Sequence, residues 1–448
     1  MKYKNIHFVG IGGIGMSALA KLCLNAGISI SGSDKQKTNI TEELKHLGAK
    51  IFYKHQKSNI FGADLVVYTC AVGENNVEII EAKNRGIYIL ERAEFLGLIA
   101  CEYQNVIAVA GSHGKTTVCG MVAKIFEVAG KNPTLLVGGE INGKSNLIIG
   151  EKETLIVEAC EYKEHFLKIG HDTGVVLNVD YDHPDYFKTT TEYEVAFQKF
   201  AQKSKQITIT DEKYSILFGN NILTFGSGGI YQAKHIKFEE DKIIYDVYKS
   251  GKFFLQIKLN CLGSFNVKNS LCSVAICDYY DIDKKHIKLG LSKFENLKRR
   301  YEYMGKINNN IVITDYAHHP TQLENCIKTT QKLYKKSITV VFEPHTYSRT
   351  KMFLSQFADA LCYAQKIIIL PTYSAREKPI KGGTSRDLYE TLKFKKANVS
   401  FVKSYKKCLK ELERIDANII LILGAGSIIK LANTIKQNYI NQSNNTPK

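Results

Sequence analysis

The chain has 448 residues, of which 44% are hydrophobic and 23% charged, and its formal net charge is +17. This composition is typical of a globular protein, and at about 150 residues per domain the length predicts three domains. No apolar run approaches 18 residues, and glycines interrupt the N-terminal apolar stretch before it reaches signal-peptide length. We therefore expect a cytoplasmic protein with no membrane partner.

The positive charge has two interpretations. It could attract nucleic acid, but the lysines are spread along the whole chain and no nucleic-acid-binding motif is found. We interpret the charge as compositional drift and expect no nucleic-acid partner. The eleven cysteines show no paired C-x-x-C spacing, and several (Cys272, Cys277 and Cys326) fall in apolar helical patterns, so we expect buried, reduced thiols.

The first elements in chain order are a short strand and a glycine-rich turn, at 6–15 with sequence IHFVGIGGIG. Apolar residues recur at helical spacing over 16–25, so the segment matches a dinucleotide-type fingerprint. A second strand at 28–31 leads to Asp34, about 20 residues beyond the glycines, where a ribose hydroxyl would lie. A nicotinamide-binding domain is therefore one serious interpretation, and a glycine turn without a ligand is the other.

Strands at 65–68 and 87–90 continue the alternation of strand and helix. They predict a small parallel sheet that ends near Ala100.

A second glycine loop lies at 106–118, where the apolar run VIAVA leads into GSHGKTTV. Gly111 and Gly114 let consecutive backbone N–H groups point inward, at the start of a helix whose dipole favours a polyphosphate. Lys115 would reach the β and γ phosphate oxygens, and the Thr116 hydroxyl would bind a bridging Mg²⁺. Val109 stands where the longer P-loop signature has glycine, so the match is to the shorter form, for which an ordinary glycine-rich turn is the alternative.

Two further strands would place metal ligands beside this loop. The strand at 154–157 delivers Glu158, and the strand at 174–177 delivers Asn178, Asp180, Asp182 and His183. Ligands collect beyond the carboxyl ends of strands in open α/β sheets, and carboxylates with an imidazole suit Mg²⁺ with its waters. A surface ion pair is the alternative for Glu158 or His183 alone.

Short alternating strands at 206–260, followed by a helix with Asn269, indicate an insertion on the central domain. A basic cluster near Leu297 marks a second boundary. Four strands of a third α/β domain follow, and their carboxyl ends carry polar clusters at 315–320, 343–349, 373–377 and 424–426. Three histidines and two arginines, one of them Arg376, converge on one edge, which favours a binding or catalytic site over satisfied core histidines.

Seven motifs together resemble those of the Mur ligases of cell-wall synthesis. They are GIGGIGMS at 10–17, GSHGKTT at 111–117, EACEY at 158–162, NVDYDHPDYF at 178–187, DYAHHP at 315–320, EPHTYSR at 343–349 and YSARE at 373–377. The resemblance covers nearly the whole chain and implies an α/β protein of three domains. These would be a Rossmann-like UDP-sugar domain at 1–101, a central P-loop ATPase-type parallel-sheet domain at 102–298, and a Rossmann-like amino-acid domain at 299–448.

The resemblance also implies roles for individual residues. Those facing the sugar nucleotide would be Gly12, Gly13, Ile14, Gly15, Ser17, Asp34 and Arg92. Those holding ATP would be Gly111, Ser112, His113, Gly114, Lys115, Thr116 and Thr117, with Asn269 on the adenine, Asp315 on the ribose and Arg300 near the phosphates. The metal ligands would be Thr116, Glu158 and His183. The residues at the amino acid would be His319, His345 and Arg349.

Within the family, the motifs are most similar to those of ligases that join L-alanine to UDP-N-acetylmuramate with ATP and Mg²⁺. The implied catalytic residues are Lys115, Glu158, His345 and Arg349, with His345 or His319 as the base for the amine. Thr346 stands where many relatives carry arginine, which leaves Arg349 as the partner of the alanine carboxylate. Phe265-Asn266 replaces a common His-Asn, and no counterpart of the carbamylated lysine of sister ligases is found. We expect a monomer or a weak homodimer.

Three alternatives stay open. A sister ligase that adds another amino acid is the nearest. A nicotinamide-dependent dehydrogenase would use the first glycine loop and Asp34, but it leaves the phosphate loop and the metal cluster without a role. A nucleic-acid binder is supported by the basic charge alone.

Overall fold

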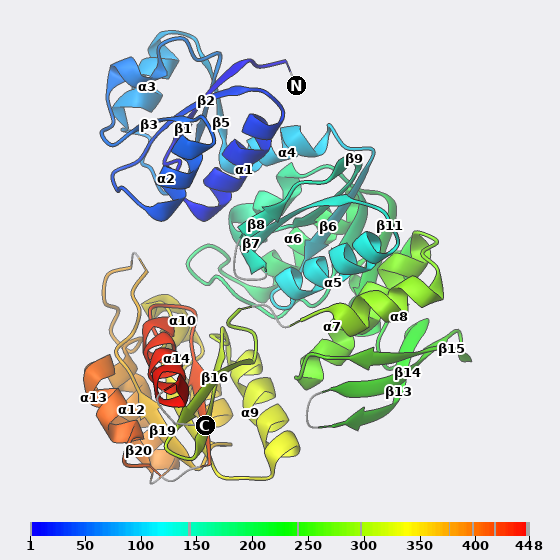
Figure 1. The fold of residues 1–448 in the computed structure, drawn as a ribbon, viewed down its shortest axis with the longest axis vertical. Coiled ribbons are helices and arrows are strands. Elements are labelled where there is room, and N and C mark those ends of the chain that lie inside the picture. The colour runs from blue at the N-terminus through cyan, green and yellow to red at the C-terminus, as the bar shows by residue number, and fades with distance from the viewer. Residues whose placement is uncertain are drawn as a thin grey trace. The chain divides into compact units, whose positions relative to one another are not determined.

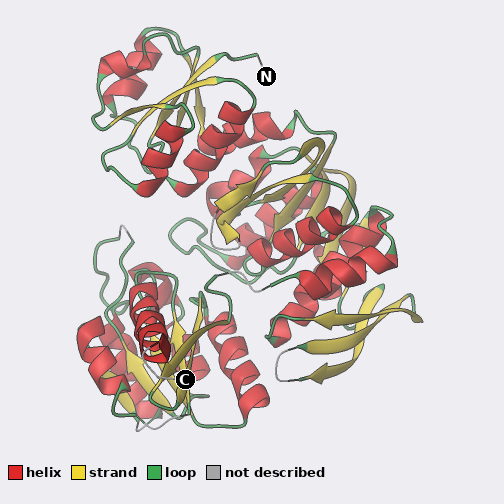
Figure 2. Ribbon diagram, viewed as in Figure 1, coloured by secondary structure: helices red, strands yellow, loops and turns green. Residues whose placement is uncertain are grey.

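The computed structural model describes residues 2–141, 145–239, 242–295, 298–375, 377–396, 398–415 and 418–444. The chain divides into two compact units, and each is interrupted in sequence by the other. Figure 1 labels the helices and strands along the chain, and Figure 2 colours them by type. Unit 1 comprises Met1–Asp180, Glu194–Gln232 and Leu271–Gly290, and unit 2 comprises Tyr181–Tyr193, Ala233–Ser270 and Leu291–Lys448.

The N-terminal sheet of unit 1 is parallel throughout, as predicted, with strand order β3-β2-β1-β4-β5. Its strands are β1 (Asn5–Val9), β2 (Ser29–Ser33), β3 (Lys50–Phe52), β4 (Leu65–Tyr68) and β5 (Tyr88–Glu91), and its helices are α1 (Ile14–Asn25), α2 (Asn39–His46), η1 (Lys57–Ile60), α3 (Val77–Asn84) and α4 (Arg92–Ala100). Val9 pairs with Ser33, so the glycine turn after β1 lies beside the end of β2. The strand order reverses next to β1, which is where open α/β sheets bind ligands.

The central sheet of unit 1 has the order β12-β11-β10-β6-β9-β7-β8. Its strands are β6 (Asn105–Ala110), β7 (Pro133–Ile141), β8 (Ser145–Ile148), β9 (Glu151–Glu158), β10 (His171–Val176), β11 (Ser204–Asp211) and β12 (Ile222–Phe225). Only the pairing of β7 with β8 is antiparallel among the pairs described for this set. The carboxyl ends of β9 and β10 flank that of β6, because Glu158 pairs with Val109 and Val176 pairs with Ala110.

Helices and further strands complete the central segment of the chain. They are α5 (Lys115–Val128), η2 (Tyr162–Lys168), α6 (Thr190–Gln202), η3 (Glu212–Leu217), α7 (Ser264–Tyr279), α8 (Lys284–Lys293) and the strands β13 (Tyr231–Phe238), β14 (Ile243–Lys249) and β15 (Lys252–Leu259). β14 and β15 form an antiparallel hairpin in unit 2. The short strands expected over 206–260 are therefore confirmed.

The C-terminal sheet of unit 2 has the order β16-β17-β21-β18-β19-β20. Its strands are β16 (Glu302–Ile307), β17 (Asn310–Asp315), β18 (Ile338–Phe342), β19 (Lys366–Ile369), β20 (Val399–Phe401) and β21 (Ile419–Leu423), and its helices are α9 (Pro320–Tyr334), α10 (Tyr347–Met352), α11 (Leu354–Leu361), α12 (Ser385–Lys395), α13 (Tyr405–Leu412) and α14 (Ile429–Asn444). β16 is antiparallel to β17, and the other described pairs are parallel.

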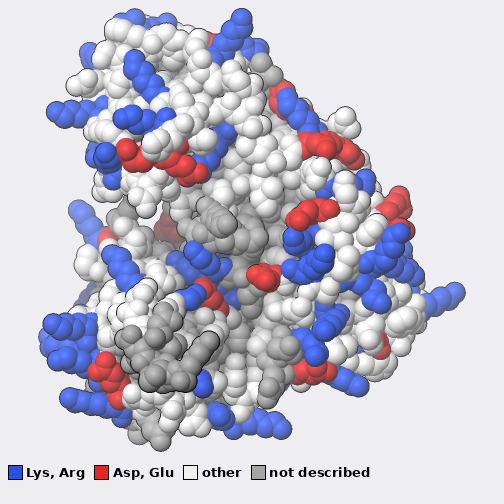
Figure 3. All heavy atoms as spheres, in the orientation of Figure 1, with Lys and Arg blue, Asp and Glu red and all other residues white. Residues whose placement is uncertain are grey.

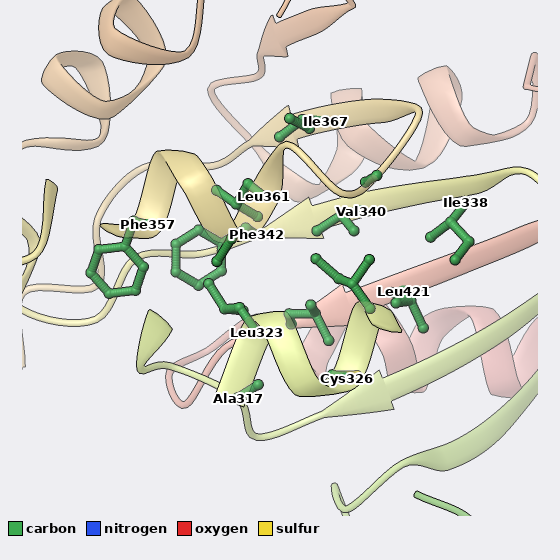
Figure 4. Close-up of a cluster of buried hydrophobic side chains, with 14 of the residues drawn as sticks. Ala317, Leu323, Cys326, Ile338, Val340, Phe342, Phe357, Leu361, Ile367 and Leu421 are labelled. Atoms are coloured by element: carbon green, nitrogen blue, oxygen red, sulfur yellow. The ribbon is translucent and has the colours of Figure 1, made fainter. Parts of the chain in front are cut away.

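Both faces of this sheet are buried, which explains the apolar runs of its strands. Val340 and Phe342 pack into one cluster with α9 and α11, as Figure 4 shows, while Val341 packs into a second cluster with α13 and α14. On β21, Leu421 packs into the first cluster, and its neighbour in sequence, Ile420, packs into the second. The core thus fixes the strands whose ends carry the predicted polar clusters.

Among the described residues, no helix combines the length and apolar character needed to cross a bilayer. On the face shown in Figure 3, Lys and Arg side chains are scattered and are interrupted by Asp and Glu. Cys272, Cys277 and Cys326 are buried and unpaired, as predicted.

Candidate active site

The phosphate loop of unit 1 connects β6 to α5 through two glycines with positive φ. Gly111 has φ 139° and Gly114, the residue before the first turn of α5, has φ 87°. A side chain is strained at either position, so glycine is required by the turn itself. The N–H groups of the first turn of α5 have no carbonyl partner within the helix, which makes this end an anion-binding element.

The segment after β10 holds the loop in place. His113 N donates to Asn178 Oδ1 (2.9 Å), and Asn178 Nδ2 donates back to His113 O (3.0 Å). Ser112 Oγ donates to Asp180 O (2.5 Å). The polar residues predicted at the end of this strand therefore shape the loop.

Lys115 extends along the loop and is largely buried, with 12% of its side chain exposed. Its Nζ donates to Glu161 Oε2 (2.8 Å) and to Gly111 O (2.5 Å). Burial alone would lower the pKa of Lys115, but the charges of Glu161, Cys160 and Glu158 together raise it, so the ammonium stays charged. The sequence identified Glu161 only as a neighbour of Glu158, and its contact with Lys115 depends on the turn after β9.

Thr116 and Glu158 provide oxygen atoms beside the loop. Thr116 Oγ1 donates to Glu158 Oε2 (2.9 Å), and the same oxygen accepts from Gly138 N (2.8 Å). A hydroxyl and a carboxylate at this spacing fit Mg²⁺, which binds protein through one or two carboxylates plus substrate phosphates. Across the described residues, no group of three or more His, Cys, Asp or Glu forms a preassembled metal site. His183, the third predicted ligand, lies in unit 2 with φ 57°.

The first glycine turn brings together the residues predicted for the sugar nucleotide. Gly12 N donates to Asp34 Oδ2 (2.9 Å), and Gly13 is the residue before α1. Ser17 Oγ donates to Ile14 O (2.9 Å). A Cβ on Gly15 would lie 3.3 Å from Cδ of Arg92, so that arginine reaches the start of α1. The second oxygen of Asp34 accepts from Gln36 N (3.1 Å), so in this structure the carboxylate shapes the turn.

In unit 2, Arg349 of α10 forms a buried ion pair with Asp182. Arg349 Nε lies 2.9 Å from Asp182 Oδ1, and its Nη2 lies 3.2 Å from Oδ2. Burial raises the pKa of Asp182, but the Arg349 guanidinium, with His183 and His318, holds the pKa well below its usual range. The sequence assigned Arg349 to the alanine carboxylate, whereas in this structure two of its nitrogens contact Asp182. No sequence signal links two residues 167 positions apart.

Arg349 also fixes the protonation of His345. Its Nη1 lies 3.1 Å from His345 Nδ1, and a guanidinium can only donate, so Nδ1 accepts and the ring proton is on Nε2. Burial, and then the charge of Arg349, lower the pKa of His345 to about 4. At neutral pH this imidazole is neutral and offers a donor at Nε2. The ring stacks on Tyr373, with centroids 5.3 Å apart.

The two histidines after β17 are also constrained. His319 precedes α9, where its Nδ1 accepts from Thr321 N (3.4 Å) and its Nε2 donates to Tyr181 O (3.2 Å). His318 Nδ1 lies 2.8 Å from Tyr316 O, so it donates, and Nε2 is the acceptor of that ring. Burial lowers the pKa of His318 well below its usual range.

A carboxylate that the sequence did not assign holds α10. Glu377 Oε2 accepts from Tyr347 N (2.6 Å) and Ser348 N (2.9 Å), and its Oε1 accepts from Ser348 Oγ (2.5 Å). It therefore anchors the first turn of the helix that carries Arg349. Arg376, the neighbouring residue that the sequence placed at this edge, lies outside the described residues.

The residues predicted for the adenine, the ribose and the approach to the phosphates lie in unit 2. Asp315 accepts from Tyr301 N (2.8 Å) and Ala317 N (2.7 Å), and burial raises the pKa of its carboxyl. The Arg300 guanidinium lies 5.0 Å from the centre of the Tyr316 ring. On α7, Asn269 Nδ2 donates to Asn266 Oδ1 (3.1 Å).

Models of three Mur ligase domains match most of the chain. Residues 5–104 match the model of the Mur ligase family catalytic domain, residues 109–277 that of the Mur ligase middle domain, and residues 299–426 that of the Mur ligase glutamate ligase domain.

Two curated relatives and one solved structure are similar over nearly their full length. UDP-N-acetylmuramate--L-alanine ligase of Clostridium botulinum (strain Loch Maree / Type A3) is 40% identical, covering 98% of both chains, and that of Caldanaerobacter subterraneus subsp. tengcongensis is 38% identical, covering 96% of both. The crystal structure of UDP-N-acetylmuramate-alanine ligase from Thermotoga maritima has a TM-score of 0.81 and 29% identity, covering 98% of this chain and 99% of its own. The order of motifs, the three matched domains and these relatives agree, and the chain belongs to the Mur ligase family.

Proposed function

We propose that this protein joins L-alanine to the carboxylate of UDP-N-acetylmuramate, using ATP and releasing ADP and phosphate, in peptidoglycan precursor synthesis. The observation that carries the proposal is the similarity to L-alanine ligases, which are 38–40% identical to this chain over 96–98% of its length. The described lysine, carboxylates and loop amides are the groups that phosphoryl transfer to a carboxylate needs. We also propose the boundaries 1–101, 102–298 and 299–448 for the domains, and a cytoplasmic monomer or weak homodimer.

The reaction requires activation, because amide formation from a free carboxylate is uphill in water. The γ-phosphoryl group of ATP is transferred to the carboxylate of UDP-N-acetylmuramate to give an acyl phosphate. The phosphate loop binds the polyphosphate through its amides, and the charged Lys115 stabilises the transferring oxygens. Thr116, Glu158 and His183 would hold Mg²⁺, which neutralises phosphate charge when bound. Glu161 orients Lys115 within this arrangement.

The ATP nucleoside is assigned to residues of α7 and β17. Asn269 would bind the adenine and Asp315 the ribose, with Arg300 near the phosphates. The UDP-sugar is assigned to the first glycine turn, where Gly13, Ile14 and Gly15 begin α1 and its dipole favours the diphosphate. Ser17, Asp34 and Arg92 flank this turn.

Arg349 and His345 are assigned to the amino acid. Nε and Nη2 of Arg349 contact Asp182, and Nη1 contacts His345, so much of the donor capacity of the guanidinium is already used within the protein. We assign its remaining donor capacity to the alanine carboxylate. The neutral His345 adds a donor at Nε2. Hydrogen bonds hold His319 at the start of α9. A base that deprotonates the amine would need an imidazole nitrogen without a proton, such as Nε2 of His318.

A phosphate-release assay tests the proposal. Purified protein with Mg-ATP, UDP-N-acetylmuramate and L-alanine should release phosphate, and omission of either substrate should abolish the release. Without ATP, UDP-N-acetylmuramate should bind and NADH should not. Turnover with D-glutamate but not with L-alanine would assign the chain to a sister activity, and NADH binding without sugar-nucleotide binding would remove the ligase assignment.

A further inference from the structure

A buried carboxylate in the N-terminal sheet domain has no role in the reaction described above. Glu78 of α3 is fully buried, with 0% of its surface exposed. Its Oε2 accepts from Ser33 Oγ (2.5 Å) and His55 Nδ1 (2.8 Å), and its Oε1 accepts from Asn59 Nδ2 (2.6 Å) and Gln56 N (3.4 Å). One carboxylate thus ties α3 to the end of β2 and to residues 55–59.

These donors keep Glu78 ionised despite its burial. Burial raises the pKa of this carboxyl, but hydrogen bonds from Ser33, His55 and Asn59, together with His7, whose Nε2 lies 3.7 Å from Oε1, lower it to about 2. A buried carboxylate is costly unless its oxygens are satisfied by donors, and here each oxygen has two. The cluster is therefore matched to a negative charge and not to a neutral amide.

Ser33 connects this cluster to the glycine turn. Its carbonyl oxygen accepts from Gly10 N (2.8 Å) and Ile11 N (3.0 Å), and the next residue, Asp34, accepts from Gly12 N (2.9 Å). Three consecutive amides of the turn are thus held by two residues at the end of β2. The side chain of the first of these residues is held by Glu78.

The turn has little tolerance for movement of this strand end. A Cβ on Gly12 would lie 2.8 Å from Asp34 Oδ2, and one on Gly32 would lie 2.5 Å from Cδ1 of Ile11. Backbone and side chains are packed so closely here that a displaced Ser33 would displace the turn with it. The amides of α1 that follow the turn would then lose their alignment.

We propose that Glu78 is a positioning residue for the sugar-nucleotide site. Through Ser33 it fixes the glycine turn and the start of α1 in the geometry that receives the diphosphate of UDP-N-acetylmuramate. This inference rests on the proposed function, because it takes the first glycine turn as the sugar-nucleotide site. Glu78 acts on the substrate only through Ser33 and the turn.

The test is Glu78→Gln, with Glu81→Gln as the matched control. The glutamine amide adds N–H donors where other donors already point, so the cluster must open. We expect KM for UDP-N-acetylmuramate to rise about tenfold or more, while KM for ATP and for alanine change less than about twofold. Glu81 lies on the same helix and pairs with Arg85 (2.6 Å), and its variant should leave all three constants unchanged.

A milder variant guards against a general folding defect. Ser33→Ala removes the hydroxyl and leaves His55, Asn59 and Gln56 on Glu78, so it should raise the same KM by a smaller factor. A merely structural role would lower kcat with the loss of folded enzyme and leave KM alone. Unchanged sugar-nucleotide binding in both variants, or equal changes in all three KM values, would overturn the inference. If the wild type itself failed to bind UDP-N-acetylmuramate in calorimetry, the proposed function would fail instead.

Discussion

The Asp182–Arg349 pair shows how strongly the candidate amino-acid site depends on single residues. Both side chains are almost fully buried, and Arg349 also sets the tautomer of His345. Removing one partner of such a pair typically costs about 3–5 kcal/mol, because the other charge stays buried without compensation. A change to either residue should therefore affect both the stability of the protein and the binding of alanine.

Arg349→Lys separates the two effects. Lysine keeps the charge opposite Asp182 but cannot reproduce the planar fork that bonds Asp182 and His345 together. We expect KM for alanine to rise about tenfold or more and KM for ATP to change less than about twofold. Steady-state kinetics with each substrate varied in turn measures this.

Asp182→Asn is the companion variant, and it should shift KM for alanine in the same direction because it loosens the guanidinium. A larger effect on ATP than on alanine in Arg349→Lys would remove Arg349 from the amino-acid site.

The sequence predicted which residues belong to the sites better than it predicted which side chains those residues contact. Gly111, Gly114 and Lys115 follow from a local motif, since a turn, a helix start and a side chain define them within a few residues. The contacts of Arg349 with Asp182 and of Glu78 with Ser33 join elements that are distant in sequence. Such contacts follow from the sheet order, which one sequence without its fold does not specify.

At the scale of elements, α4 and η2 make an unusually close approach in unit 1. An ideal Cβ on Gly97 of α4 would lie 2.1 Å from the carbonyl oxygen of Lys168. Real side chains do not approach a backbone oxygen so closely, so glycine is required here by packing between elements. The glycine is inside a helix, where alanine would otherwise be favoured by about 1 kcal/mol.

Gly97→Ala should therefore destabilise the protein by about 1–3 kcal/mol despite the gain in helix propensity. Thermal unfolding followed by circular dichroism measures it. Gly170→Ala is the control, because a Cβ there meets nothing within 4 Å, and its unfolding midpoint should stay within about 1 °C of the wild type. A Gly97→Ala protein as stable as this control would show that α4 and η2 separate freely.

Elements with an uninterrupted apolar run were predicted closely. The range 65–68 predicted for one strand matches β4, and β18 and β21 end directly before the polar clusters predicted at 343–349 and 424–426, because a strand buried on both faces is apolar along its length. The short strands β3 and β20 and the hairpin of β7 with β8 were not predicted. Three-residue strands carry too little pattern, and the pairing of β7 with β8 depends on contacts beyond the local sequence.

At the scale of the whole molecule, buried histidines make stability depend on pH. His165 of η2 lies 3.4 Å from Glu91 Oε2, with Arg92, Lys163, Lys168 and Glu94 also acting on it. Burial, followed by Arg92, lowers its pKa from 6.5 to about 4. Between these values the unfolded chain binds more protons than the folded chain, so stability falls as the pH decreases from 6.5 to 4.

His165→Gln should reduce this dependence. The variant lacks one proton-binding group in the unfolded state, so its loss of stability between pH 6.5 and 4 should be smaller by up to about 1.4 kcal/mol per pH unit. Denaturant titrations at several pH values measure the slopes. Above pH 7 the slopes of the two proteins should agree, and a steeper acid loss in the variant would contradict the assignment.

The interleaving of the two units limits how this chain can be divided. The polypeptide passes from one unit to the other after Asp180, Tyr193, Gln232, Ser270 and Gly290. A fragment that starts at residue 299 would keep Arg349 but leave Asp182 behind, and one that ends at residue 298 would carry Asp182 without its arginine. Modular exchange of a C-terminal domain between relatives, by recombination or in the laboratory, must therefore transfer a short upstream segment together with it.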